Sequence, residues 1–306
     1  MAILFMSIKV PLSFIIAFLD ALRFEKRYSP HTIRSYQDDL TQFFDFLQVQ
    51  FGELTISQVS PSLVRSWLAS LKDAKLTAKS INRKISALKS FFRYQMRVGI
   101  IEVTPMTNIV APGIGKRLPQ YIDQKDMAAL LTDVDFPDTW KGKTDYLLIS
   151  IFYQTGIRES ELVNLKETDV DLANATMKVL GKGNKERIIP LNDSLARQMD
   201  EYRSDKRKVL DAYSADYLLV SKNGKKLYAR YIYRVVHDYL GQVTTVKKRS
   251  PHILRHTFAT HLTNNGADLN AVKELLGHSS LAATQVYTHN TIERLKDIHK
   301  KAHPKS

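Results

Sequence analysis

Apolar side chains in the first hundred residues recur every third or fourth position, which is the spacing of an α-helix with one buried face. Four such stretches stand out, with apolar positions at Phe14, Phe18 and Leu22, at Ile33, Tyr36, Leu40, Phe43 and Leu47, at Val64, Trp67, Leu68 and Leu71, and at Ile81, Ile85, Leu88 and Phe92. Ser29 and Pro30 mark the start of the second stretch, because serine caps helix N-termini and proline fits the first turn. The pattern predicts an all-helical domain over residues 1–104.

A segment rich in proline and glycine interrupts this pattern. Residues 105–118 hold two prolines, two glycines and the adjacent cations Lys116 and Arg117. Such a composition is typical of an exposed segment between domains. We expect it to link the N-terminal domain to a second domain over residues 119–306, and its two cations are candidates for contact with a phosphate backbone.

The second domain mixes helical and strand spacing. Asp123 is suited to cap a helix, and residues 146–153 are almost wholly apolar, as in a buried helix. Strands are expected at residues 176–180 and 187–191, a further strand and hairpin at 216–225, and helices at about 230–240, 252–265, 268–276, 280–288 and 291–300. The pattern predicts a mixed α+β domain that is mainly helical.

Charge and composition narrow the class of partner. Lys and Arg number 45 against 31 Asp and Glu, so the formal net charge is +14, which suits a polyanion such as nucleic acid. The chain has no cysteine, which excludes disulfides, thiolate zinc sites and cysteine nucleophiles. The apolar stretch at residues 10–19 is too short to span a bilayer and carries no cleavage signal, so we expect no membrane partner. Met1 and Met6 are both candidate starts.

The fourth helix carries its own concentration of positive charge. Its candidate contacts to DNA are Lys79, Arg83, Lys84, Lys89 and Arg93. A solvated face explains such a run about as well as a nucleic-acid contact does, but the sign of the net charge favours the phosphate backbone of DNA.

Residues suited to chemistry at a phosphodiester lie in the second domain. They include Arg158, Arg255, His252, His278 and Tyr287. Arginines form paired hydrogen bonds to phosphate oxygens, histidines transfer protons near neutral pH, and a tyrosine hydroxyl can act as a nucleophile. Each alone is an ordinary residue, so the signal lies in the combination.

Local spacing brings some of these residues together. His252 and Arg255 are three residues apart in an expected helix, so they share a face and can reach one phosphate. Glu161 follows Arg158 by three residues and is placed to hold its guanidinium. These relations predict a phosphate site with a carboxylate behind it.

Two glycine-containing turns hold the remaining candidates. Gly277 is suited to end a helix, which leaves His278 exposed after it. Lys182 lies in the turn between the two expected strands. The sequence leaves two interpretations open: the turn is a solvated loop, or it brings this lysine to a leaving oxygen. The turn is not a Walker phosphate loop, because the pattern G-x-x-x-x-G-K-[ST] is absent.

The motifs around these residues resemble those of the tyrosine recombinases, and specifically the Xer type that resolves chromosome dimers. They are residues 155–162 (TGIRESEL), 181–187 (GKGNKER), 251–256 (PHILRH), 275–279 (LLGHS) and 287–289 (YTH). Residues 29–36 (SPHTIRSY) resemble the opening of the family's second helix, and residues 303–305 resemble an Xer-type tail. The resemblance extends over essentially the whole chain.

The resemblance implies a role for each candidate residue. Arg158 and Arg255 would bind the phosphate, His252 would assist proton transfer, Lys182 would protonate the leaving 5′ oxygen, His278 would hydrogen-bond a phosphate oxygen, and Tyr287 would be the nucleophile. Glu161 and Asp169 would support this site, and Thr32 in the second helix would contact DNA. The implied reaction uses no metal ion and no other cofactor.

The resemblance also implies a fold and a set of partners. An all-α, SAM-like core-binding domain and a mixed α+β catalytic domain would close on double-stranded DNA as a C-shaped clamp. Recombination at a specific, dif-like site would take four protomers, either identical or shared with a paralogous recombinase. The helix at 291–300 would dock on a neighbouring protomer. A DNA translocase is a candidate regulator, and the expected location is the cytoplasm, with the nucleoid.

Several other functions remain open from the sequence. A mobile-element integrase of the same family would share every motif, and a non-catalytic DNA-binding module would share the scaffold but has no need of Tyr287. A type IB topoisomerase-like enzyme shares the chemistry without the docking helix. A metal-dependent nuclease fits least, because His252, His256 and His261 have no carboxylate cluster beside them in the sequence.

Overall fold

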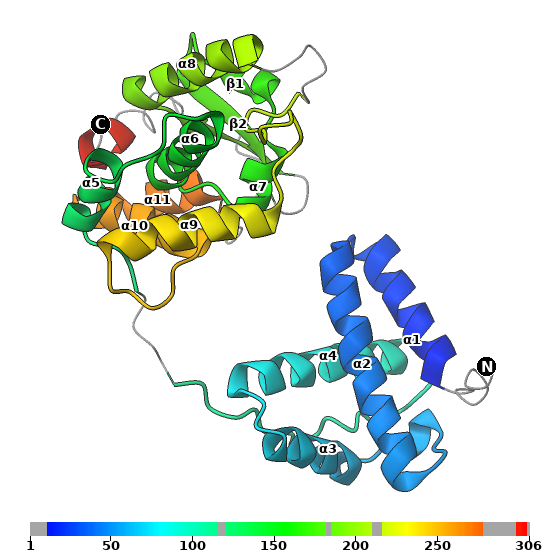
Figure 1. The fold of residues 1–306 in the computed structure, drawn as a ribbon. Coiled ribbons are helices and arrows are strands. Elements are labelled where there is room, and N and C mark those ends of the chain that lie inside the picture. Colours follow the sequence, from blue (N-terminus) through cyan, green and yellow to red (C-terminus); the bar gives the residue numbers. More distant parts are fainter. Residues whose placement is uncertain (1–10, 116–119, 182–184, 210–215, 278–297, 305–306) are drawn as a thin grey trace, which may run out of the picture. The chain divides into compact units, whose positions relative to one another are not determined.

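The chain forms two compact units, Met1–Arg117 and Leu118–Ser306 (Figure 1). The structure, a computed structural model, describes residues 11–115, 120–181, 185–209, 216–277 and 298–304. Each unit has its own apolar core, so each is described by itself.

The first unit is helical, as its apolar spacing predicts. Its elements are α1 (Pro11–Asp20), the π-helical turn η1 (Ala21–Glu25), α2 (Pro30–Phe51), η2 (Ile56–Gln58), α3 (Pro61–Asp73) and α4 (Ala78–Arg97). Ser29 caps α2, since its hydroxyl accepts a hydrogen bond from the backbone N–H of Thr32 at 3.3 Å, and Pro30 occupies the first turn. Both expectations for this helix start are confirmed.

Aromatic side chains fill the core of the first unit, where α2 packs against α1, α3 and α4. Phe43 is fully buried and lies edge-to-face against Trp67, with ring centres 5.0 Å apart. Met106 and Ile109, from the segment assigned to the linker, are buried in the same core. The segment expected to be exposed from residue 105 onward therefore begins by packing on the first unit, because two of its apolar side chains fill that core.

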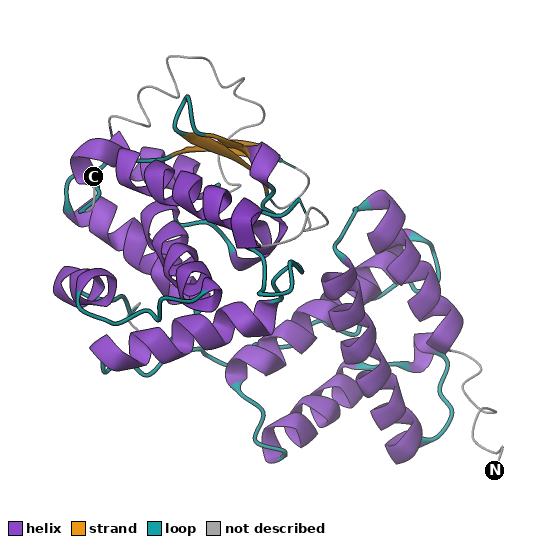
Figure 2. Cartoon of the chain, turned by 45° about the horizontal axis from the view of Figure 1, so that its top comes forward, coloured by secondary structure: helices purple, strands orange, loops and turns teal. Residues whose placement is uncertain are grey.

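The second unit is built mostly of helices, with a small sheet at one edge (Figure 2). Its helical elements are α5 (Gln124–Thr132), α6 (Trp140–Thr155), α7 (Glu159–Asn164), η3 (Glu167–Asp169), α8 (Asp193–Val209), α9 (Ala229–Val243), α10 (Pro251–Asn264) and α11 (Leu269–Leu276). The antiparallel strands β1 (Val170–Asp171), β2 (Thr176–Leu180) and β3 (Glu186–Pro190) lie in that order. Figure 2 shows the sheet as a minor part of a unit built mostly of helices.

The sheet agrees with the sequence only in part. The bounds of β2 are those expected, and β3 begins one residue earlier than expected. The strand expected at residues 216–220 is wrong, since only isolated bridges join Tyr217 to Lys166 and Val220 to Lys226. The turn expected at residues 222–225 is present, and the antiparallel bridge between Val220 and Lys226 flanks it. Two backbone hydrogen bonds form this turn, because the N–H of Ser221 donates to the carbonyl of Lys225 and the N–H of Gly224 donates to the carbonyl of Ser221.

Helix α6 is the buried centre of the second unit, as the apolar run predicts. Every residue from Leu147 to Thr155 is buried, and α10 packs across the helix. The end of α6 leads directly into Arg158, so the core of the unit positions that side chain. Within the described part of the chain, no helix is both long and apolar enough to cross a membrane.

The C-terminal segment packs on its own unit. Residues 298–302 are helical, and Ile298 and Ala302 contact an apolar cluster formed by α10 and α11. That the helix at 291–300 docks on a neighbouring protomer stays a prediction; its described end, at Ile298, packs on an apolar cluster of the same chain. The expected helix at 280–288 and the rest of 291–300 lie outside the described residues.

Candidate active site

A left-handed turn brings Arg158 out of the core. Helix α6 ends at Gly156, whose φ of +60° is a conformation that side chains other than glycine rarely adopt. A Cβ atom there would lie 2.5 Å from Cδ1 of Phe258, so packing and backbone geometry both require glycine. Arg158 follows as the N-cap residue of α7.

A buried carboxylate joins two arginines from different elements. The side chain of Glu161 is 2% exposed and accepts hydrogen bonds from the backbone N–H of Arg158 at 2.8 Å and from Nη1 of Arg158 at 2.7 Å. Arg187 of β3 donates through Nη1 and Nη2 to its two oxygens, at 2.7 and 2.8 Å. The expectation that Glu161 holds the guanidinium of Arg158 is confirmed.

Opposing effects act on the protonation of Glu161. Burial by itself raises its pKa, but the hydrogen bonds and charges of Arg187 and Arg158 outweigh burial and lower the pKa from 4.5 to about 2. The carboxylate is therefore ionised throughout the neutral range and is a fixed negative charge beneath the arginines.

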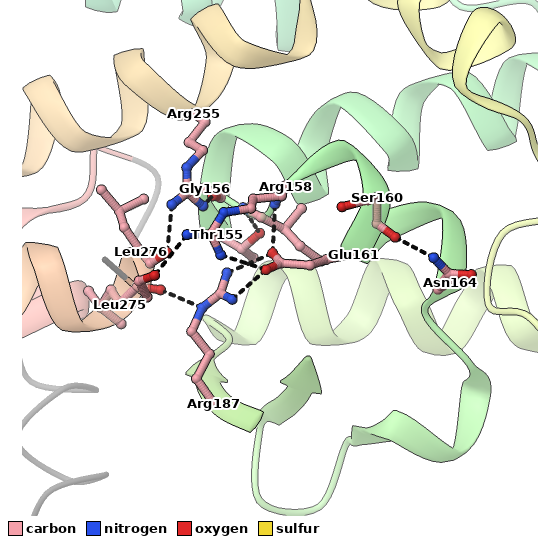
Figure 3. A network of polar contacts seen from close by, with 12 residues as sticks. Thr155, Gly156, Arg158, Ser160, Glu161, Asn164, Arg187, Arg255, Leu275 and Leu276 are labelled. Carbon is pink, nitrogen blue, oxygen red and sulfur yellow. Dashed lines mark hydrogen bonds and ion pairs between the residues drawn. The ribbon is translucent and has the colours of Figure 1, made fainter. Parts of the chain in front are cut away.

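The C-terminus of α11 holds three arginines at once (Figure 3). Arg187 donates to the carbonyl of Leu275 at 2.9 Å, Arg255 to that of Leu276, and Arg158 to that of Gly277 at 2.8 Å. The last carbonyls of a helix lack partners within it and carry partial negative charge. Three consecutive carbonyls thus find donors in three different elements, and Gly277 is the expected left-handed C-cap.

Positive charge exceeds negative charge in this cluster. The carboxylate of Glu161 pairs with Arg158 and Arg187, and the charges of both arginines act on a third, Arg255. Burial, and then the charges of Arg158 and Arg187, lower the pKa of Arg255 to about 9, which leaves it charged at neutral pH. Because the side chain of Arg158 is still 27% exposed, the cluster is open to solvent there and suits an anion with several oxygens.

His252 lies at the edge of this cluster. It is exposed in the first turn of α10, three residues before the buried Arg255. Burial raises the pKa of Glu159, which follows Arg158 in the chain, and the charge of His252 offsets only part of that rise. In the described part of the chain, no group of three or more His, Cys, Asp or Glu side chains could hold a metal ion.

The structure does not bring every expected site residue to the arginines. Asp169, the last residue of the short helix η3, accepts a hydrogen bond from the backbone N–H of the N-cap residue Lys166 at 2.9 Å, and its described contacts include none of the arginines that we expected it to support. Its carboxylate instead satisfies a backbone donor of its own turn. Lys182, His278 and Tyr287 lie outside the described residues.

The candidate DNA contacts of α4 divide into exposed and buried residues. Lys79, Arg83, Lys89 and Arg93 are exposed. Lys84 is buried, contrary to the expectation, because its ammonium group donates to Asp39 at 2.9 Å and to Gln42. Of the other candidates, Thr32 is half-buried beside Ser29, and Lys116 and Arg117 lie outside the described residues.

Arg187 is the site residue that sequence reasoning missed. The alternation of β3 places it on the same face as Ile189, and both are buried. A charged residue at an inward strand position needs a partner of opposite charge, and this was the available signal. Only the tertiary structure identifies Glu161 as that partner.

Comparison with known proteins assigns both units to one family. The model of the phage integrase family matches residues 120–294, and the model of the phage integrase N-terminal SAM-like domain matches residues 15–99. The chain belongs to the phage integrase family. The tyrosine recombinase XerC of Staphylococcus saprophyticus is 39% identical over 95% of this chain and 97% of its own length. That of Staphylococcus aureus is 39% identical over 95% and 96%.

Two solved structures share this fold. The XerH site-specific recombinase bound to palindromic difH substrate has a TM-score of 0.69 at 23% identity, over 95% of this chain and 89% of its own. The Tn1549 transposon integrase in complex with a circular intermediate DNA also has a TM-score of 0.69, at 22% identity over 92% and 99%. The helical N-terminal domain and the mixed catalytic domain expected from the sequence are confirmed as the fold class of this phage integrase family member.

We expect Glu161→Gln to destabilise the folded chain by about 3 kcal/mol at neutral pH, because it leaves buried guanidinium groups without their counter-charge. The pKa of Glu161 is lower in the folded chain than the usual 4.5, so its stabilisation is complete above pH 4.5 and is lost as the pH falls toward 2. Urea unfolding at several pH values measures the difference in the free energy of unfolding between the wild type and Glu161→Gln. That difference should become smaller as the pH falls from 4.5 toward 2.

Glu25→Gln is the matched control. Glu25 pairs with Arg97 at 3.0 Å, but both side chains are more than half exposed, at 54% and 52%. An exposed pair of this kind contributes at most about 1 kcal/mol. Equal losses of stability in the two variants would contradict the role of Glu161 as the anchor of the arginines.

Proposed function

We propose that this member of the phage integrase family resolves chromosome dimers by site-specific recombination. The observation that carries the proposal is the cluster of three guanidinium groups, of which two pair with the carboxylate of Glu161, so that the cluster keeps net positive charge beside the partly exposed side chain of Arg158. Its sequence support is the 39% identity to recombinases named XerC over 95% of the chain. A phosphodiester is the anion that such a cluster fits best.

The proposed reaction is a transesterification at phosphorus. The phenolic oxygen of Tyr287 forms a bond to phosphorus as the bond to the 5′ oxygen breaks, which produces a 3′-phosphotyrosyl link and a 5′ hydroxyl. Tyrosine has a pKa near 10, so its proton needs an acceptor, and His252 is the proposed one. Lys182 protonates the leaving oxygen, and His278 donates to a non-bridging oxygen. A 5′ hydroxyl from a partner duplex reverses the reaction and exchanges strands.

The arginines stabilise the transition state in this scheme. Negative charge grows on the equatorial oxygens as phosphorus becomes five-coordinate, and Arg158 and Arg255 are already held in place by backbone carbonyls. Donors that are fixed before the reaction pay no reorganisation cost during it. One phosphoester replaces another, so the scheme needs no external energy source.

DNA contacts follow from the exposed cations of both units. The proposed backbone contacts in the first unit are the exposed cations Lys79, Arg83, Lys89 and Arg93 and the half-buried Thr32, together with Lys116 and Arg117, which lie outside the described residues. The exposed face of α9, with Arg230, Tyr233 and Arg234, adds a surface that the sequence analysis did not single out. Closure of both units on the duplex would form the C-shaped clamp, and two duplexes would take four protomers, identical or shared with a paralogue, at the nucleoid.

A mobile-element integrase is the rival function. The transposon integrase has the same TM-score, 0.69, as the XerH recombinase, so the fold does not separate them. Chromatin immunoprecipitation of the tagged chain distinguishes the two functions. We expect one strong chromosomal site at the region where replication ends, whereas binding confined to the ends of a mobile element would overturn dimer resolution. The sequence recovered serves as the substrate below.

A covalent intermediate is the sharpest test of the proposed chemistry. We expect a nicked duplex carrying the recovered site to form a denaturation-resistant adduct with the wild-type chain in EDTA, and Tyr287→Phe to abolish it, because phenylalanine has no attacking oxygen. Denaturing gel electrophoresis measures the adduct. Tyr28→Phe, at an exposed tyrosine of the first unit, should leave the adduct intact. An undiminished adduct in Tyr287→Phe would place the nucleophile elsewhere.

Arg255→Ala tests the phosphate site separately from DNA binding. We expect the rate of adduct formation to fall about 10²–10³-fold, the usual cost of one lost transition-state donor, while affinity for the site stays within about tenfold. Gel-shift titration and single-turnover cleavage measure the two quantities. Arg197→Ala, at an exposed arginine of α8, is the control and should change neither. Loss of binding with cleavage intact would refute the assigned role.

A further inference from the structure

Two histidines near the C-terminus lie against the end of α6. Nε2 of His299 lies 2.6 Å from the carbonyl oxygen of Gln154, and Nε2 of His303 lies 3.1 Å from that of Tyr153. A carbonyl oxygen only accepts, so each Nε2 carries the proton and donates. Both accepting carbonyls belong to the last turn of α6, where a helix lacks donors of its own.

The two imidazole rings form one compact cap. They are stacked with centres 5.1 Å apart and planes 11° apart, and both rings contact the ring of Phe258. His299 is 2% exposed and His303 is 4% exposed. Burial lowers the pKa of His299, so the neutral form is favoured there. Asn265 fixes the same segment by donating to the carbonyl of Ala302 at 2.7 Å.

The capped turn of α6 is covalently continuous with the arginine cluster. After Gln154 and Thr155 comes Gly156, whose carbonyl accepts a hydrogen bond from Nη1 of Arg255. Arg158 lies two residues further on. A shift of the α6 terminus therefore displaces one acceptor of Arg255 and the backbone that carries Arg158, although neither histidine contacts an arginine in the described contacts.

We propose that His299 and His303 are positioning residues for strand cleavage, which hold the turn at 156–158 by capping the C-terminus of α6. The proposal rests on the proposed function, in which Arg158 and Arg255 bind the scissile phosphate. In this role the N–H donors of the imidazoles matter, and not only their volume. The structure thus makes the alignment of the phosphate site depend on the seating of the C-terminal segment.

Two double variants separate the effect of the imidazole N–H donors from the effect of side-chain packing. His299→Gln with His303→Gln keeps an N–H donor near the position of each Nε2, whereas His299→Met with His303→Met keeps similar volume without a donor. We expect the methionine pair to reduce the single-turnover cleavage rate at least about tenfold, which corresponds to about 1.4 kcal/mol. Affinity for the site should stay within about threefold, and the glutamine pair should cleave within about threefold of wild type.

The substrate is the nicked duplex carrying the recovered site, and gel-shift titration with thermal melting accompanies each cleavage assay. If the methionine pair does not fold, the single variants His303→Met and His303→Gln carry the same comparison. Wild-type cleavage by the methionine variants, or equal losses in the glutamine and methionine variants, would overturn the proposal. If the wild-type chain itself forms no adduct, the proposed function fails and the positioning role fails with it; an active wild type with unaffected variants overturns the positioning role alone.

Discussion

The last three carbonyls of α11 and the carboxylate of Glu161 hold three arginines, and the rest of the catalytic unit is arranged around this cluster. Arg158 comes from the start of α7, Arg187 from β3 and Arg255 from α10, so one set of hydrogen bonds joins four elements that are distant in sequence. The partial negative charge of a helix C-terminus offsets only part of the repulsion among three guanidinium groups. The repulsion that remains among the guanidinium groups favours the binding of a phosphate.

Burial explains why this cluster is rigid as well as charged. A single unpaired charge inside the unit would cost several kcal/mol, so every described member needs its partner, and the position of each arginine depends on the others. The same constraint links the cluster to helix termini. The carbonyls of α11 are satisfied by arginines, and those of α6 by His299 and His303. The same hydrogen bonds therefore stabilise the fold and position the residues of the proposed phosphate site.

Buried cations with different roles cannot be told apart by residue type. Lys84 of α4 and Arg187 of β3 both lie in the core, yet Lys84 pairs with Asp39 inside the helical unit and Arg187 pairs with Glu161 at the phosphate site. Helical spacing predicted a charged face for Lys84, whereas the burial of Arg187 is known only from the structure. In both cases the partner is more than 25 residues away in sequence, so no local pattern reveals it.

The sequence by itself determined the helices of the first unit, strands β2 and β3, the caps at Ser29 and Gly277, and the pairing of Arg158 with Glu161, because each depends on neighbours within one or two helical turns. The motifs, through their resemblance, determined the family. The tertiary structure alone decided the isolated bridges where a strand was expected, the burial of Lys84, the place of Arg187 and the capping of α6 by the C-terminal segment. These are contacts between distant segments, and packing rather than local spacing selects them.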